Sequence, residues 1–190
     1  MGSEVPEPWR GFLQDTDRLL SNVVSLHCLG GFVVTACYGL PRVTADLDVL
    51  VVLPSDTQAF LARLAGRNSE LHRKHGIYLD VVTVATCPDD YEQRLTEVFP
   101  GVCQYLHLLA LDPYDLALAK LERNLQRDRD DVVYLAEAVP FDISVLRERY
   151  RREMRPNLGR PEREDLTLDL WIDIIDEHRR GRGHDPDRGR

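Results

Sequence analysis

The sequence predicts an α/β fold followed by a helical C-terminal part. Apolar runs rich in valine and leucine alternate with amphipathic segments over about the first 110 residues, which predicts strands and helices in turn. From about residue 111 onward, the apolar residues recur only at helical spacing. We therefore predict an α/β core over residues 1–110, a helical part packed on it over residues 111–180, and a disordered tail over residues 181–190.

The elements of the core follow in order from local patterns. Leucines and valines at helical spacing predict a first helix over residues 9–25. Gly39 and Pro41 are typical of a helix end, and Pro54 ends the strongest predicted strand. The remaining segments of the core are predicted as strands over residues 25–31, 42–54, 77–85 and 102–111 and as helices over residues 32–40, 55–67 and 89–99.

Helices alone are predicted after the core. Asp112 and Pro113 are typical of a helix start, and a kink near Arg127 separates the first two segments. The predicted helices cover residues 112–126, 128–138, 143–154 and 163–180.

Composition limits the classes of protein that fit this chain. It has 190 residues, 43% of them hydrophobic and 29% charged, as expected for an ordinary globular protein. No apolar run approaches the roughly 20 residues that span a membrane, and the polar N-terminus is unlike a secretory signal, so no membrane partner is expected. The four cysteines form no CxxC pair and lie in apolar surroundings, which predicts buried free thiols and a cytoplasmic location.

The charge of the chain is unevenly distributed. The formal net charge of -8 argues against bulk, non-specific binding to nucleic acid. Residues 147–190, however, contain 12 arginines and 11 acidic residues, and several of these arginines fall in the run RERYRREMR over residues 147–155. This part of the chain is either a solvated helix face with a disordered tail or a surface that contacts RNA.

Two glycines lie about fifteen residues ahead of an Asp-Leu-Asp sequence in the strongest predicted strand. Asp46 and Asp48 are two residues apart, so both carboxylates are expected on one face of the strand. Gly30 and Gly31 separate a strand from a helix, where backbone N–H groups and the helix dipole favour phosphate. Together these features predict a site for Mg²⁺ and a nucleotide, although each alone also fits a tight turn or an ordinary pair of aspartates.

Asp80 is a third candidate ligand because it lies inside a valine-rich predicted strand. A carboxylate is costly to bury there unless it is paired or binds a metal ion. A neighbouring strand would bring Asp80 beside Asp46 and Asp48, and three carboxylates could hold two Mg²⁺ ions. The alternative is that Asp80 lies at a strand end, where it is either exposed or paired with Arg73 or Lys74.

Lys120, Arg123 and Arg127 are spaced three and four residues apart, which predicts one basic helix face. Such a face could bind a triphosphate. Asp131 is expected to orient Lys120 or an arginine rather than to bind metal. The alternative is an amphipathic helix whose charged residues form ion pairs with one another.

The first of these patterns resembles a known family. In nucleotidyltransferase-like proteins of the AbiEii type, including the MenT group of toxins, a Gly-Gly turn is followed by an Arg-x-Thr-x-Asp-x-Asp strand. Arg42, Thr44, Asp46 and Asp48 match that strand residue by residue. Phe32 stands where many relatives in the DNA polymerase β superfamily have serine.

A second, more degenerate motif of the family is similar to the later part of the chain. It has a lysine, then a basic residue followed by Asp, then another Asp. Lys120, Arg127 with Asp128, and Asp131 match it, with Arg127 where lysine is usual. The resemblance covers roughly residues 20–135.

The resemblance implies a nucleotidyltransferase core, built as a small mixed sheet flanked by helices. It implies an NTP as co-substrate, pyrophosphate as leaving group, and two Mg²⁺ ions held by Asp46, Asp48 and Asp80, with Lys120 as a fourth catalytic residue. The residues that would bind the nucleotide are Gly30, Gly31, Arg42, Thr44, Lys120, Arg123, Arg127 and Asp131.

The resemblance also implies an acceptor and a partner. Members of the MenT type transfer nucleotides to the 3′ end of tRNA, which blocks translation, and each is a toxin paired with an antitoxin. Two other functions fit the same residues. One is transfer to a hydroxyl of a protein or of a small molecule such as an aminoglycoside, and the other is a catalytically inactive, nucleotide-binding regulatory module.

Overall fold

The computed structural model describes residues 5–82 and 85–182. The chain forms two compact units. The first unit consists of Met1–Ala85 and Tyr91–Asp112, and the second of Thr86–Asp90 and Pro113–Arg190. The main change of unit therefore falls at Asp112, and one short segment ahead of it belongs to the second unit.

The first unit contains a five-stranded sheet in the order β3-β2-β1-β5-β4. Its strands are β1 (Val24–Leu29), β2 (Asp46–Leu53), β3 (Tyr78–Val81), β4 (Thr96–Val98) and β5 (Leu106–Ala110). The central strand β1 runs antiparallel to β2 and parallel to β5. The outer pairs are parallel for β2 and β3 and antiparallel for β4 and β5. The expected small mixed sheet is confirmed.

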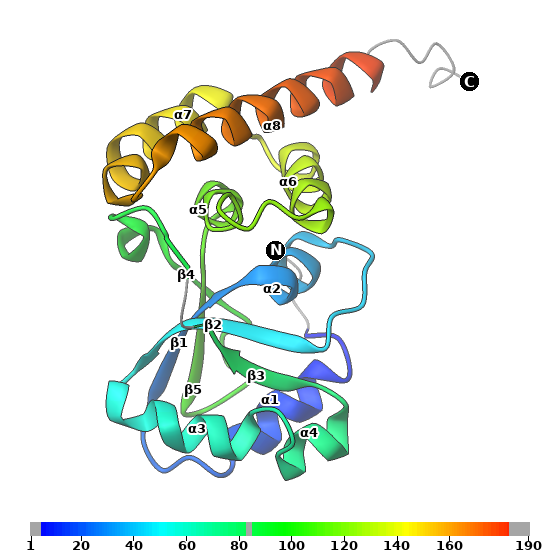
Figure 1. The fold of residues 1–190 in the computed structure, drawn as a ribbon. Coiled ribbons are helices and arrows are strands. Elements are labelled where there is room, and N and C mark those ends of the chain that lie inside the picture. The colour runs from blue at the N-terminus through cyan, green and yellow to red at the C-terminus, as the bar shows by residue number, and fades with distance from the viewer. Residues whose placement is uncertain (1–4, 83–84, 183–190) are drawn as a thin grey trace, which may run out of the picture. The chain divides into compact units, whose positions relative to one another are not determined.

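Helices cover this sheet and supply much of its apolar core. They are α1 (Trp9–Asp17), α2 (Gly30–Tyr38), α3 (Gln58–Ala65) and α4 (Glu70–His75), with short 3₁₀ turns at Ser55–Thr57 and Tyr91–Arg94. Figure 1 shows α1, α3 and α4 lying together along the sheet. The buried Asp17 carboxylate accepts backbone N–H bonds from Tyr105 and Leu106, at 2.7 and 2.8 Å, and so joins the end of α1 to the start of β5.

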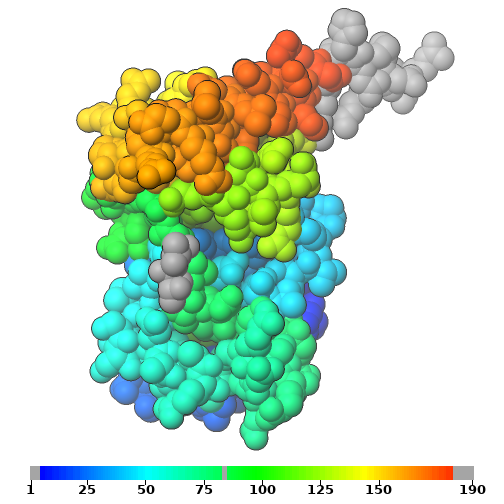
Figure 2. All heavy atoms as spheres, in the orientation of Figure 1, coloured from blue at the N-terminus to red at the C-terminus, as the bar shows by residue number. Residues whose placement is uncertain are grey.

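In its described part, the second unit contains helices joined by turns and loops. Its helices are α5 (Pro113–Leu118), α6 (Gln126–Ala138), α7 (Ile143–Arg149), the π-helical η3 (Tyr150–Met154), the 3₁₀ turn η4 (Arg155–Asn157) and α8 (Pro161–Arg182). Trp171 of α8 is almost fully buried in one apolar cluster with residues of the other helices. Figure 2 shows α8 in orange along the surface of this unit.

Several predicted boundaries are wrong, two of them because strand pairing overrides the local pattern. The helix predicted over 9–25 ends at Asp17, since Val24 already pairs with Leu106 in the sheet. The helix predicted over 89–99 is instead a 3₁₀ turn followed by β4, whose Thr96–Val98 pairs with β5. The predicted tail starts too early, because α8 continues to Arg182, and its remainder, 183–190, lies outside the described residues.

The cysteines match the prediction in part. Cys28 and Cys37 are buried free thiols, whereas Cys87 and Cys103 are free but only half-buried. Burial raises the pKa of Cys37, Cys87 and Cys103 to about 12, so all three remain protonated at neutral pH. Over residues 5–82 and 85–182, no helix combines the length and apolar character needed to cross a bilayer.

Candidate active site

The Gly-Gly turn lies directly against the second aspartate of the Asp-Leu-Asp sequence. Strand β1 leads directly into α2 (Figure 1). The strand ends at Leu29, and the helix begins at Gly30, whose φ is +73°. A Cβ atom at Gly30 would lie 1.8 Å from Oδ2 of Asp48, a distance at which no two such atoms can coexist. Both the backbone conformation and the neighbouring carboxylate therefore require glycine at this position.

The ladder between β1 and β2 creates this close approach. Leu29 is the register partner of Asp48, so the end of β1 and the start of β2 lie side by side. Asp46 and Asp48 are two residues apart on β2, and each is half-buried. Because alternate strand residues share a face, the two carboxylates lie on the same face of the sheet.

The segment before β2 completes this cluster. The Thr44 hydroxyl donates a 2.7 Å hydrogen bond to Oδ1 of Asp46, which fixes the direction of that carboxylate. A Cβ atom at Gly31 would lie 3.1 Å from Thr44 Oγ1 and 3.6 Å from Arg42 Nη2. The structure thus brings the whole first motif together: Gly30, Gly31, Arg42, Thr44, Asp46 and Asp48.

Asp80 lies on the neighbouring strand. Strands β2 and β3 are parallel, and Asp48 and Asp80 are register partners, as the sequence suggested. Asp80 is exposed near the end of β3, so the expectation that it is buried is wrong and the alternative of an exposed strand end fits. Lys74, one of its two suggested ion-pair partners, bonds to Asp15 at 2.5 Å. In the described part of the chain, however, no three Asp, Glu, His or Cys side chains are arranged to hold a metal ion together.

The residues of the first unit fit a Mg²⁺ ion held by two carboxylates. Mg²⁺ in nucleotide enzymes is usually bound by one or two carboxylates, with phosphate and water oxygens in the other positions. Asp46 and Asp48 supply such a pair. The first turn of α2 begins beside them, and the Leu29 side chain does not cap its N–H groups, so a phosphate there would meet the positive end of a helix.

The second predicted motif forms a separate cluster in the second unit. Lys120 is only 5% exposed, and its ammonium lies 2.9 Å from Oδ2 of Asp131 and 3.6 Å from Oδ1 of Asp128. Both aspartates are completely buried at the start of α6. Burial alone would raise the pKa of Asp128, but hydrogen bonds from Arg123 and Leu125 N–H, with the nearby Lys120 charge, hold that pKa below its usual value.

The predicted basic helix face over Lys120, Arg123 and Arg127 is wrong. Helix α5 ends at Leu118, and Lys120 and Arg123 lie in the turns before α6, so the three residues do not share one helix. Arg123 binds both oxygens of Asp128, and Arg127 is exposed on α6. The expected contact between Asp131 and Lys120, by contrast, is present.

Two features were missed or left open by reasoning from the sequence. Asp128 lies close to both Lys120 and Arg123, a role that the sequence did not assign to it although the residue matches the second motif. The arginine run over residues 147–155 lines a pocket, and its spacing of four residues between Arg147, Arg151 and Arg155 was visible in the sequence.

Comparison with known proteins identifies the family. Residues 13–179, well over half of the chain, match the model of a family described as "Nucleotidyltransferase of unknown function (DUF6036)". No curated protein and no solved structure matches the chain. The matched range includes both the cluster around Asp48 and the cluster around Lys120. The chain therefore belongs to the DUF6036 family of nucleotidyltransferases of unknown function.

Proposed function

We propose that this protein is a Mg²⁺-dependent nucleotidyltransferase that transfers nucleotides from an NTP to the 3′ end of tRNA and so blocks translation. In this proposal it is the toxin of a toxin–antitoxin pair and binds a cognate antitoxin protein. The observation that supports the transferase site is the fit of Gly30 against the Asp48 carboxylate. The tRNA acceptor and the toxin role rest on the resemblance to the MenT group.

The proposed reaction is a displacement at the α-phosphorus of the NTP. The acceptor hydroxyl oxygen forms a bond to this phosphorus, the bond to the bridging oxygen of the β-phosphate breaks, and pyrophosphate leaves. Asp46 and Asp48 would hold Mg²⁺, with Asp80 of the neighbouring strand as a third ligand. When bound, two Mg²⁺ ions would lower the pKa of the acceptor hydroxyl and neutralise charge on the triphosphate.

The other residues of the first motif would bind phosphate or move a proton. The N–H groups of Gly30 and Gly31 would donate to phosphate oxygens at the start of α2. Asp80 is exposed, and its carboxylate would accept the proton of the acceptor hydroxyl. Thr44 would keep Asp46 in place through its 2.7 Å hydrogen bond, and Arg42 would pair with a phosphate or with one of the carboxylates.

The second motif is assigned to the triphosphate by the resemblance alone. Lys120 would bind the β- or γ-phosphate as a point charge, and Asp131, 2.9 Å away, would orient it. Arg123 and Arg127 would add positive charge to the same phosphates. Replacement of Lys120 then weakens the use of NTP more than the binding of metal.

The test is transfer from each of the four labelled NTPs to total tRNA in the presence of Mg²⁺. Asp48→Asn removes one carboxylate charge with almost no change of volume, so it should abolish transfer while the protein stays folded. Asp56→Asn is the matched control, because Asp56 is an exposed aspartate of the 3₁₀ turn after β2. Label on tRNA that disappears only in Asp48→Asn supports the proposal.

Other outcomes of this transfer experiment would contradict parts of the proposed function. Label that appears on proteins or aminoglycosides but not on tRNA would move the acceptor to another hydroxyl class. Binding of Mg²⁺-NTP without transfer to any acceptor would leave a nucleotide-binding regulatory module. A normal transfer rate in Asp48→Asn would exclude the proposed carboxylate site itself.

A further inference from the structure

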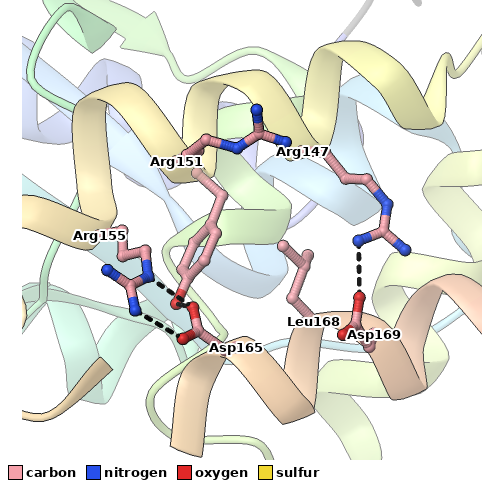
Figure 3. A pocket seen from close by; sticks show the side chains of 7 residues that line it. Arg147, Arg151, Arg155, Asp165, Leu168 and Asp169 are labelled. Atoms are coloured by element: carbon pink, nitrogen blue, oxygen red, sulfur yellow. Dashed lines mark hydrogen bonds and ion pairs between the residues drawn. The ribbon is translucent and has the colours of Figure 1, made fainter. Parts of the chain in front are cut away.

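An open pocket of about 390 Å³ lies within the second unit, apart from the residues of both predicted motifs. Arg147, Arg151 and Arg155 line one wall, and α8 supplies the other through Asp165, Leu168 and Asp169 (Figure 3). The wall residues are mostly charged, so this surface is not built to receive an apolar segment.

The helical run that carries the three arginines changes its winding: Arg147 lies in α7, Arg151 in η3 and Arg155 at the start of η4. In a continuous α-helix, residues four apart rotate by about 40° at each step, so a third arginine would turn away from the first. Here α7 passes into the π-helical η3 at Tyr150, and the wider winding of a π-helix offsets that rotation. Arg147, Arg151 and Arg155 therefore all reach one pocket.

Two of the three arginines are held by aspartates of α8. Arg147 bonds to Asp169 at 2.6 Å, and Arg155 forms a bidentate pair with Asp165 at 2.8 and 2.9 Å. The Tyr150 hydroxyl donates to Asp165 at 2.8 Å. The Arg155 hydrogen bond lowers the pKa of Asp165, so this pair is ionised at neutral pH.

Arg151 differs from Arg147 and Arg155, the other two arginines of the pocket. It is exposed, it lies between the two ion pairs in Figure 3, and within residues 5–82 and 85–182 it has no hydrogen-bond or ion-pair partner. Three arginines and two aspartates give the pocket a formal charge of +1, and Arg151 is the cation that no aspartate neutralises. A guanidinium in this state is a good ligand for a phosphate, which it can bind through two N–H groups.

We propose that this pocket binds one backbone phosphate of the acceptor RNA, with Arg151 in direct contact. The inference rests on the proposed function in that it takes the acceptor to be RNA. A phosphodiester carries a single negative charge and so matches the single unneutralised arginine, whereas a triphosphate carries several charges. The ion pairs of Arg147 and Arg155 hold the flanking guanidinium groups in place, which reduces the entropy lost on binding.

The test measures binding of a short fluorescein-labelled RNA to the full chain over a series of salt concentrations. Arg151→Gln is expected to weaken binding by about fivefold and to reduce the salt slope by about 1, as for the loss of one phosphate contact. Arg152→Gln is the matched control, because Arg152 is the next residue, is 73% exposed and pairs only weakly with Glu148. It should leave both values close to those of the wild type.

A variant that raises the positive charge of the pocket should have the opposite effect on RNA binding, which strengthens the test. Asp169→Asn removes the partner of Arg147 at an exposed position and raises the charge of the pocket by one. It should tighten RNA binding by about two- to threefold and increase the salt slope. Equal effects of Arg151→Gln and Arg152→Gln, or weaker binding by Asp169→Asn, would overturn the proposal.

Two further measurements separate this inference from the proposed function and from a smaller ligand. Arg151-dependent RNA binding without transfer to any RNA retains the phosphate site and rejects the transferase proposal. Transfer to RNA that does not depend on Arg151 supports the transferase proposal and rejects the phosphate site. Displacement of the RNA from wild type, but not from Arg151→Gln, by millimolar inorganic phosphate or ATP would identify a site for free phosphate compounds and overturn the RNA assignment.

Discussion

Asp48 in the first unit and Asp131 in the second are both aspartates of predicted motifs, yet their surroundings differ. Asp48 is half-buried beside a glycine whose missing side chain makes room for its carboxylate. Asp131 is completely buried, and the ammonium of Lys120 lies 2.9 Å from it. The first arrangement sets a half-buried carboxylate against the start of α2, whereas the second encloses its carboxylate completely beside a cation of the same chain.

This difference predicts where the effects of mutation appear. An ion pair in a protein interior offsets a large loss of hydration, so removal of one partner leaves a costly buried charge. A half-exposed carboxylate keeps much of its hydration, so its removal changes stability little. Substitutions at Lys120 should therefore change the free energy of unfolding first, and substitutions around Asp48 should change transfer first.

The largest expected effect is that of Lys120→Met on stability. Loss of the ammonium removes one cation from beside two completely buried carboxylates, Asp131 and Asp128, so unfolding should become easier by about 3–5 kcal/mol. Urea denaturation measures this value. A loss below about 1 kcal/mol would show that the pair does not stabilise the second unit, so the contrast between Asp131 and Asp48 would not extend to stability.

The same substitution also separates two roles of Lys120. In the double variant Lys120→Met/Asp131→Leu, an apolar pair replaces an ionic one, so part of the lost stability should return. If the double variant is folded, its KM for NTP reports on phosphate binding. A normal KM would leave Lys120 with a structural role alone, whereas a raised KM would support its contact with the triphosphate.

The next effect is that of Gly30→Ala, and Gly76→Ala is its control. Both glycines have a positive φ, +73° and +72°, so each substitution should cost about 1–2 kcal/mol of stability through the backbone. Only the Cβ at position 30 overlaps the Asp48 carboxylate, since a Cβ at Gly76 meets nothing within 4 Å. Transfer should therefore fall by tenfold or more in Gly30→Ala alone. Equal activities in the two variants would show that the position of Asp48 does not matter.

A smaller effect is expected from Thr44→Val. It removes the 2.7 Å hydrogen bond to Asp46 at a half-exposed position, worth about 1 kcal/mol, so kcat/KM should fall by about fivefold. Thr44→Ser keeps the hydroxyl and should retain most of the activity. If Thr44→Ser loses as much activity as Thr44→Val, the methyl group rather than the hydrogen bond supports the site.

The elements of the first motif could be predicted from sequence because each of them is set locally, although their close approach depends on the pairing of β1 with β2. A strand, two glycines and a helix follow one another in the chain, and both the turn at Gly30 and the alternation of Asp46 and Asp48 depend on neighbouring residues. The register of Asp48 and Asp80 depends on pairing between distant segments. The sequence predicted only that Asp80 would lie beside Asp46 and Asp48 if the two strands were neighbours, and β2 and β3 are neighbours with Asp48 and Asp80 in register.

The structure around the second motif could not be predicted from local sequence patterns. The apolar pattern continues past Leu118, but α5 ends there, and Lys120 packs with Asp128 and Asp131 from the next helix. Strand β4 was missed for a related reason, because three residues over Thr96–Val98 acquire their structure only by pairing with β5. Such contacts between distant segments leave no periodic signal in the sequence.

The smallest expected effect concerns the pH dependence of stability and arises from Asp128 in the second unit. The pKa of Asp128 is lower in the folded state than in the unfolded state, so its ionised form stabilises the fold above the unfolded value of about 4. This contribution is lost as the pH falls from that value through the folded pKa.

Arg123→Gln removes a hydrogen-bonded charge and should raise the folded pKa of Asp128, so the midpoint of acid unfolding should move to slightly higher pH. The shift is small because the Arg123 side chain is 51% exposed and screened by solvent. Arg127→Gln, an exposed position on the same helix, should leave the midpoint unchanged, and an equal shift in both variants would assign the effect to net charge rather than to Asp128.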